Sequence, residues 1–194
     1  MQLLFRGIRL YKQMEQSTTS LVEGCRKGSR SAQLALYRNH AGRLYAACFR
    51  IIGNAPEAEE AMQDAFLKIF TRIGQYRTGL CFEAWMQRIA VRTAIDYVRK
   101  QNPAPEELTD RYADTSVEEE EAAEESVAYS VERVKSGLQR LPAGYRMILS
   151  LYLFEGYDME EIASILDIKQ VTVRTQYLRA KKKLLDLITD EHHG

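Results

Sequence analysis

Between Asp158 and Leu187 the chain carries two helical patterns separated by only three residues. Asp158, followed three residues later by Glu161, is a capping-box signature for the start of a helix. The apolar face of this first helix is supplied by Ile162, Ala163, Ile165 and Leu166. Residues 167–169 predict a tight turn, because an Asp at position 167 tolerates the left-handed conformation. Two helices joined so closely must cross and pack on further helices, so we predict a helix-turn-helix.

The second helix, expected over about residues 170–187, has two chemically different faces when it is plotted at 100° per residue. The face expected to pack inward holds Val173, Tyr177, Ala180 and Leu184. The opposite face holds Arg174, Thr175, Leu178, Arg179 and Lys182. Guanidinium groups suit base edges and phosphates, a hydroxyl suits a phosphate, and an apolar group suits a thymine methyl. This pattern predicts a helix that enters the DNA major groove; the alternative is a solvated, charged face.

Helical periodicity also dominates upstream, and no stretch alternates as a strand would. Helices are expected over about residues 56–73, 82–100, 131–141 and 145–154, with Pro56 and nearby acids at a helix start. Few glycines and prolines, 11 and 4, agree with this. We therefore predict an all-α fold.

The charge is unevenly distributed although the net charge is zero. Residues 20–101 carry thirteen basic and seven acidic residues, a net +6, whereas residues 102–130 carry one basic and ten acidic residues, a net −9. A segment that acidic, opened by Pro103 and Pro105, is typical of a solvated linker. We expect a poorly ordered basic leader at 1–19, with Met14 as an alternative start, and two small helical domains at 20–101 and 131–194 joined by the acidic linker at 102–130.

Several function classes lack support in the sequence. The three cysteines, Cys25, Cys48 and Cys81, have no zinc-binding or disulfide-framework spacing, which fits a reduced cytoplasmic setting. No apolar run reaches the roughly 18 residues of a membrane span. There is no phosphate loop, metal cluster or nucleophile motif. We therefore expect no enzyme activity, no metal and no cofactor.

Two further sets of residues are candidate contact surfaces. Glu60, Gln63, Asp64, Leu67 and Lys68 lie away from the apolar stripe of their helix. The segment that follows interleaves aromatic and cationic side chains, a combination that suits unpaired bases. Its candidate residues are Tyr76, Arg77, Arg88, Arg92 and Arg99. Tyr76 is the expected stacking ring because it lies in a loop, whereas Phe82 and Trp85 are expected in the core.

Taken together, these motifs resemble the extracytoplasmic-function (ECF) branch of the sigma-70 family. Residues 58–70, 82–90 and 96–100 resemble the polymerase-binding and promoter-melting helices of its region two, and residues 141–184 resemble its region four. The resemblance implies that the set at 60–68 binds the beta-prime clamp helices of core RNA polymerase. It implies that the set at 76–99 binds the melted minus-ten element and that the set at 174–182 reads the minus-thirty-five element of promoter DNA. An anti-sigma protein is a further candidate partner.

Three departures from the family pattern carry expectations of their own. Lys169 and Val171 replace small residues at the start of the recognition helix, which weakens its capping. Gln176 stands where a basic residue is common, at the edge of the outward face, so we expect an altered promoter preference. The linker is more acidic than tethering requires.

The residues alone leave two other functions open. The first is a helix-turn-helix regulator that acts as a dimer without polymerase, and the second is a helical adaptor whose acidic linker binds basic partners. Neither accounts for both halves of the chain.

Overall fold

The computed structural model describes residues 18–77, 81–102, 108 and 131–189, and in these ranges it contains helices, turns and no strand. The all-α prediction is therefore confirmed. The expected leader, except residues 18 and 19, and the expected linker, except residues 102 and 108, lie outside the described residues. The described chain divides into two compact units: residues 18–48 with 59–93, and residues 49–58 with 94–189.

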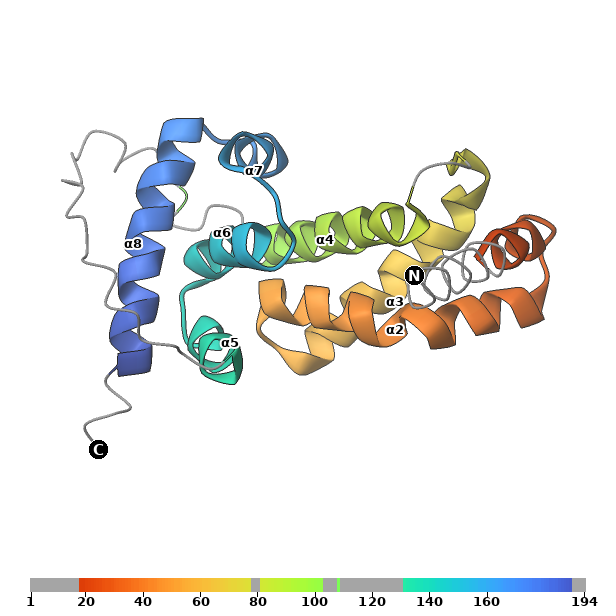
Figure 1. Ribbon diagram of the computed structural model, residues 1–194, viewed down its shortest axis with the longest axis horizontal. Helices are drawn as coiled ribbons and strands as arrows, with labels where there is room; N and C mark the ends of the chain where they lie inside the picture. Colours follow the sequence, from red (N-terminus) through yellow and green to blue (C-terminus); the bar gives the residue numbers. More distant parts are fainter. Residues whose placement is uncertain (1–17, 78–80, 103–107, 109–130, 190–194) are drawn as a thin grey trace, which may run out of the picture. The chain divides into compact units, whose positions relative to one another are not determined.

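Three long helices form most of the N-terminal half (Figure 1): α2 (Arg30–Ile52), α3 (Ala55–Arg72) and α4 (Phe82–Gln101). Their facing residues are apolar and often small, as with Ala58, Ala61 and Ala65 on α3, which are fully buried. Small side chains let the neighbouring helices approach closely. Tyr37 on α2 packs on Phe66 of α3 with ring centroids 4.8 Å apart.

Local chemistry explains where α3 begins and ends. Gly53 adopts a left-handed φ of +81°, which ends α2, and the Asn54 side chain accepts a hydrogen bond from the Glu57 amide at 3.1 Å. This side-chain cap satisfies one of the amides that a helix start leaves without a partner. At the other end α3 tightens into the short 3-10 helix η1 (Ile73–Gln75).

A further helix at residues 18–26 precedes α2, and the sequence patterns did not predict it. Val22 and Cys25, three residues apart, are its buried side chains. The helix ends in a turn at Gly28, which has a φ of +75°.

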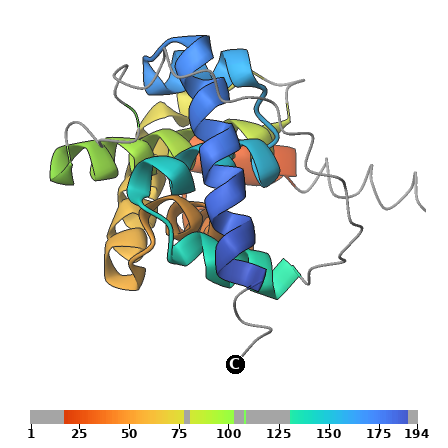
Figure 2. The same ribbon diagram turned by 90° about the vertical axis from the view of Figure 1, so that its left-hand side faces the viewer.

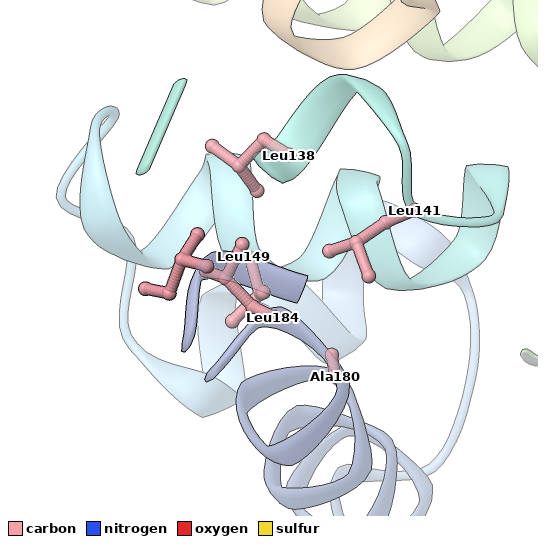
Figure 3. Packing of buried hydrophobic residues seen from close by; sticks show 6 residues of the cluster. Leu138, Leu141, Leu149, Ala180 and Leu184 are labelled. Carbon is pink, nitrogen blue, oxygen red and sulfur yellow. The ribbon is translucent and has the colours of Figure 1, made fainter. Parts of the chain in front are cut away.

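The C-terminal helices are α5 (Val131–Gln139), α6 (Ala143–Leu153), α7 (Met159–Leu166) and α8 (Gln170–Thr189). The other three all pack against α8, with α7 at its N-terminal end and α5 toward its C-terminal end (Figures 1 and 2). The core between α5, α6 and α8 is drawn in Figure 3 and contains Leu138, Leu141, Leu149, Ala180, Leu184 and Ile188. Gly137 permits the close approach of α5 and α8, because a Cβ there would lie 2.7 Å from Leu184 Cδ1.

Within the second unit, Arg146 on α6 contacts the last residues of α2. Its guanidinium donates to the carbonyls of Ile51 at 3.1 Å, Ile52 at 2.6 Å and Leu141 at 2.9 Å. Burial lowers the pKa of Arg146 from its ordinary value. The three carbonyl contacts compensate the partial loss of water around this charge.

Candidate nucleic-acid interface

The start of α7 is fixed by a complete capping box, as the sequence predicts. The Asp158 carboxylate accepts hydrogen bonds from the amides of Glu160 and Glu161, at 2.9 and 2.8 Å. The Glu161 carboxylate accepts from the Asp158 amide at 3.0 Å. Asp167 ends the helix in the left-handed region, with φ 51° and ψ 49°, which confirms the predicted turn. Since both ends of α7 are set by local bonds, the direction in which α8 leaves the turn is defined.

The exposed side of α8 is cationic. Arg174 and Lys182 are exposed, as are the neighbouring Lys181 and Lys183, while Leu178 and Arg179 are partly buried. Arg174, Leu178 and Lys182 follow each other at four-residue spacing and therefore share one face. We call these three residues the α8 stripe. It combines a planar donor, an apolar group and a flexible ammonium, which suits contact with base edges and phosphates.

Two expectations on α8 are wrong. Thr175 was expected to face outward, but it is only 8% exposed and its hydroxyl donates to the Val171 carbonyl at 3.0 Å. Gln176 was expected at the edge of the outward face, but it is fully buried, and its side-chain amide has no hydrogen-bond partner among the described residues. Because α5, α6 and α7 all pack on α8, its buried face is wider than one apolar stripe. The inference that Gln176 alters promoter preference by direct contact therefore falls.

The aromatic cluster at the start of α4 also differs from expectation. Tyr76 is only 8% exposed, and its ring lies 4.9 Å from that of Phe82 and 5.6 Å from that of Trp85, measured between centroids. The expectation that Tyr76 presents an open ring because it lies in a loop is therefore wrong: its ring is covered by its neighbours. Phe82 is buried as expected, whereas Trp85 is partly exposed. The loop position of Tyr76 did not predict its burial, because two rings of the next helix cover it.

His40 on α2 borders the same cluster. Its ring meets the edge of Phe82 with centroids 6.4 Å apart and an interplanar angle of 80°. Burial lowers the pKa of His40 from 6.5; the charge of Arg43 lowers it further, while that of Glu83 opposes the shift. Burial of the ring therefore disfavours its charged form relative to an exposed histidine.

Three of the four expected cations near α4 are exposed. Arg77 follows Tyr76 directly, and Arg88 and Arg92 lie one turn apart on α4. Arg99 differs, because it is partly buried and its guanidinium donates to the Leu166 carbonyl at 2.6 Å. The structure thus presents Arg88 and Arg92 together, on one face of the helix, as the sequence spacing predicts.

On α3, all but one of the residues of the expected contact face are exposed to solvent. Glu60, Gln63 and Asp64 are exposed, and Leu67 is 65% exposed, the largest fraction among the large apolar side chains that the structure describes. Lys68 is partly buried instead, and its ammonium donates to the Thr93 hydroxyl of α4 at 3.1 Å. The face therefore consists of one apolar side chain bordered by polar ones, without Lys68.

No helix in the described ranges is both long and apolar enough to cross a membrane.

Comparison with known proteins gives matches in both halves of the chain. Sigma-70 region 2 matches residues 36–103, and sigma-70 region 4 matches residues 132–184. The ECF RNA polymerase sigma factor SigW of Bacillus subtilis is 27% identical over 192 residues, which cover 91% of this chain and 100% of that protein. The ECF RNA polymerase sigma factor SigE of Mycolicibacterium smegmatis is 31% identical over 157 residues, 79% of this chain and 60% of that protein.

Two solved structures share the fold. The structure of CnrH in complex with the cytosolic domain of CnrY has a TM-score of 0.51 and 22% sequence identity to this chain. The match covers 90% of this chain and 98% of the CnrH chain. The sigma factor RpoE of Bartonella quintana, in complex with the anti-sigma factor NepR, has a TM-score of 0.51 and 19% sequence identity. The match covers 80% of this chain and 95% of the RpoE chain.

The order of the two regions, the full-length relatives and the helix-turn-helix that ends in a cationic face all agree. The chain therefore belongs to the extracytoplasmic-function subfamily of sigma-70 RNA polymerase sigma factors.

Proposed function

We propose that this sigma factor selects promoters through the α8 stripe, which reads the minus-thirty-five element in the major groove. The observation that carries this proposal is the α8 stripe itself, with Arg174 and Lys182 exposed and Leu178 partly exposed between them, on a helix that follows the capped helix α7. Arg174 has the planar fork that pairs with a guanine edge, and Lys182 suits a phosphate. Arg179 completes the surface at its border.

The face of α4 that holds Arg88 and Arg92 is proposed to bind the melted minus-ten strand. Two exposed cations one turn apart can hold successive phosphates, and Arg77 adds a third charge beside the start of the helix. The partly exposed Trp85, rather than the buried Tyr76, is the ring of this cluster with a surface open to a base. Arg99 can join this contact only if it releases the Leu166 carbonyl.

The α3 face is proposed to bind core RNA polymerase at its beta-prime clamp helices. Leu67 supplies an apolar centre, and Glu60, Gln63 and Asp64 supply a polar border, which is the usual anatomy of a protein contact. RNA synthesis itself is proposed to belong to the polymerase, so this chain contributes binding and no catalysis.

The remaining assignments follow from the same proposal. The domain at 20–101 carries the polymerase and minus-ten contacts, the domain at 131–194 carries the minus-thirty-five contact, and the acidic segment 102–130 tethers them in the cytoplasm. An anti-sigma protein is a proposed regulator, because RpoE was solved with the anti-sigma factor NepR.

A quantitative pull-down on core RNA polymerase tests the α3 assignment. Asp64→Arg and Leu67→Glu should each weaken binding, because one reverses a border charge and the other places a carboxylate at the apolar centre. Glu132→Arg, an identical charge change on the exposed side of α5, is the matched control and should bind as the unaltered chain does. Undiminished binding by both α3 variants would remove this assignment.

A further inference from the structure

Arg26, at the end of the helix at 18–26, reaches the far end of α3. Its NH2 group donates to the Tyr76 carbonyl at 2.5 Å, and its Nε donates to the Ile73 carbonyl at 3.4 Å. Its NH1 group is held by the Glu23 carboxylate at 2.6 Å. This residue lies before the part of the chain that matches sigma-70 region 2, which begins at residue 36.

The two carbonyls stand where the backbone changes direction. The last carbonyls of a helix have no partner within the helix, so they need a donor from elsewhere. The Ile73 carbonyl already accepts from the Tyr76 amide at 3.3 Å, and the Arg26 guanidinium adds a charged donor to both residues. The backbone is thereby held at Tyr76, immediately before the exposed Arg77.

Tyr76 transmits this restraint to α4. Its ring packs against Phe82 and Trp85, which belong to the first turn of that helix. A shift of the Tyr76 backbone would displace the ring and change the surroundings of Trp85. Arg26 thus acts on the same segment that the proposed function assigns to the minus-ten element, without lying on α4 itself.

The geometry requires a guanidinium rather than any positive charge. Three groups are engaged in different directions by one planar fork, which an ammonium cannot reproduce. The helix that carries Arg26 is itself anchored by the buried Val22 and Cys25. Arg26 is exposed as a residue, and its hydrogen bonds to Glu23, Ile73 and Tyr76, rather than burial, define the position of its side chain.

We propose that Arg26 is a positioning residue for minus-ten recognition: it holds the Ile73–Tyr76 backbone and so sets the placement of Arg77 and of the first turn of α4. The proposal rests on the proposed role of α4 in binding the melted strand.

Holoenzyme assembled from core polymerase and Arg26→Ala or Arg26→Lys should form open complexes about ten-fold less well, as expected when a charged hydrogen bond is lost. Permanganate reactivity of the melted thymines measures this. Core binding should stay unchanged. Arg30→Ala removes the same charge from an exposed site nearby and should open promoters normally. Normal opening by Arg26→Lys would overturn the proposal in favour of a simple electrostatic contact, and a parallel loss of core binding would overturn it in favour of a general folding defect.

A spectroscopic measurement on the free chain separates this proposal from the proposed function. Trp85 is the single tryptophan of the chain, so its acrylamide quenching reports the Tyr76 cluster alone. Both Arg26 variants should increase quenching at temperatures where circular dichroism shows an intact fold; unchanged quenching would overturn the positioning role. If Arg92→Ala opens promoters normally while the quenching changes, the minus-ten assignment of α4 fails and the restraint on Tyr76 stands.

Discussion

Replacing Asp158 by Ala should destabilise the C-terminal helices, because it removes one side of the capping box. The substituted side chain accepts two amides, those of Glu160 and Glu161, at 2.9 and 2.8 Å. The third bond of the box, from the Asp158 amide to Glu161, uses the backbone and is retained. Asp158 is exposed, so the substitution removes no packing.

The expected loss follows from these bonds. Removal of an N-cap side chain costs about 0.5–2 kcal/mol, and the loss of two acceptor contacts places Asp158→Ala in the upper half, at roughly 1–2 kcal/mol. For a domain of this size the unfolding midpoint should fall by about 5–10 °C. Thermal unfolding followed by far-ultraviolet circular dichroism measures the shift. Asp158→Asn keeps a cap acceptor and should recover most of the midpoint. An unchanged midpoint for Asp158→Ala would show that the capping box does not stabilise α7.

Three further predictions follow from other sites. Gly137→Ala should lower the free energy of unfolding by about 1 kcal/mol, because the added Cβ would lie 2.7 Å from Leu184 Cδ1 and 2.8 Å from Ile188 Cγ2, and this overpacking outweighs the gain in helix propensity. A raised midpoint of thermal unfolding would contradict this. Burial lowers the pKa of His40, so its contribution to stability is complete above the ordinary value of 6.5 and is lost as the pH falls through that value toward the folded pKa. In denaturant titrations, the free energy of unfolding of His40→Gln should therefore fall less steeply on acidification than that of the unaltered chain. An identical pH dependence in the two proteins would show that burial of His40 does not contribute to it. Arg174→Ala should reduce discrimination at one base pair of the minus-thirty-five element by about 1–3 kcal/mol. Lys182→Ala should instead weaken binding to all DNA sequences alike and lower the slope of log K against log salt concentration by about one. If mobility-shift assays show the reverse, Lys182 contacts the base and Arg174 the phosphate.

The features that the sequence predicted well are those set by neighbouring residues. The capping box of α7 and the left-handed Asp167 depend on side chains within three or four positions, so the local pattern was sufficient. The exposed Arg174 and Leu67 were also predicted, because helical periodicity places them away from the apolar stripe.

Burial that depends on a third element was not predictable in this way. Thr175 and Gln176 lie beside the apolar stripe of α8, and only the packing of three helices on α8 shows that they are covered. Tyr76 is buried by rings from the next helix, although its own segment is irregular. Lys68 turns from the α3 face toward Thr93 for a related reason, since a hydroxyl on α4 is within its reach.

Arg26 shows the limit most clearly. The carbonyls that it contacts are 47 and 50 residues away in the sequence, and nothing in the pattern around Arg26 distinguishes it from Lys27 beside it. The spacing of the buried Val22 and Cys25 was the one available sign that this part of the chain forms a helix.

Run-off transcription with purified core RNA polymerase and a pool of genomic promoter fragments tests whether this chain directs the polymerase to promoters. We expect discrete transcripts that require this chain and that weaken when Arg174 or Arg92 is replaced by Ala. Transcripts that are the same with and without the chain, while the chain alone binds DNA at paired half-sites, would contradict the account and favour a dimeric regulator that acts without polymerase.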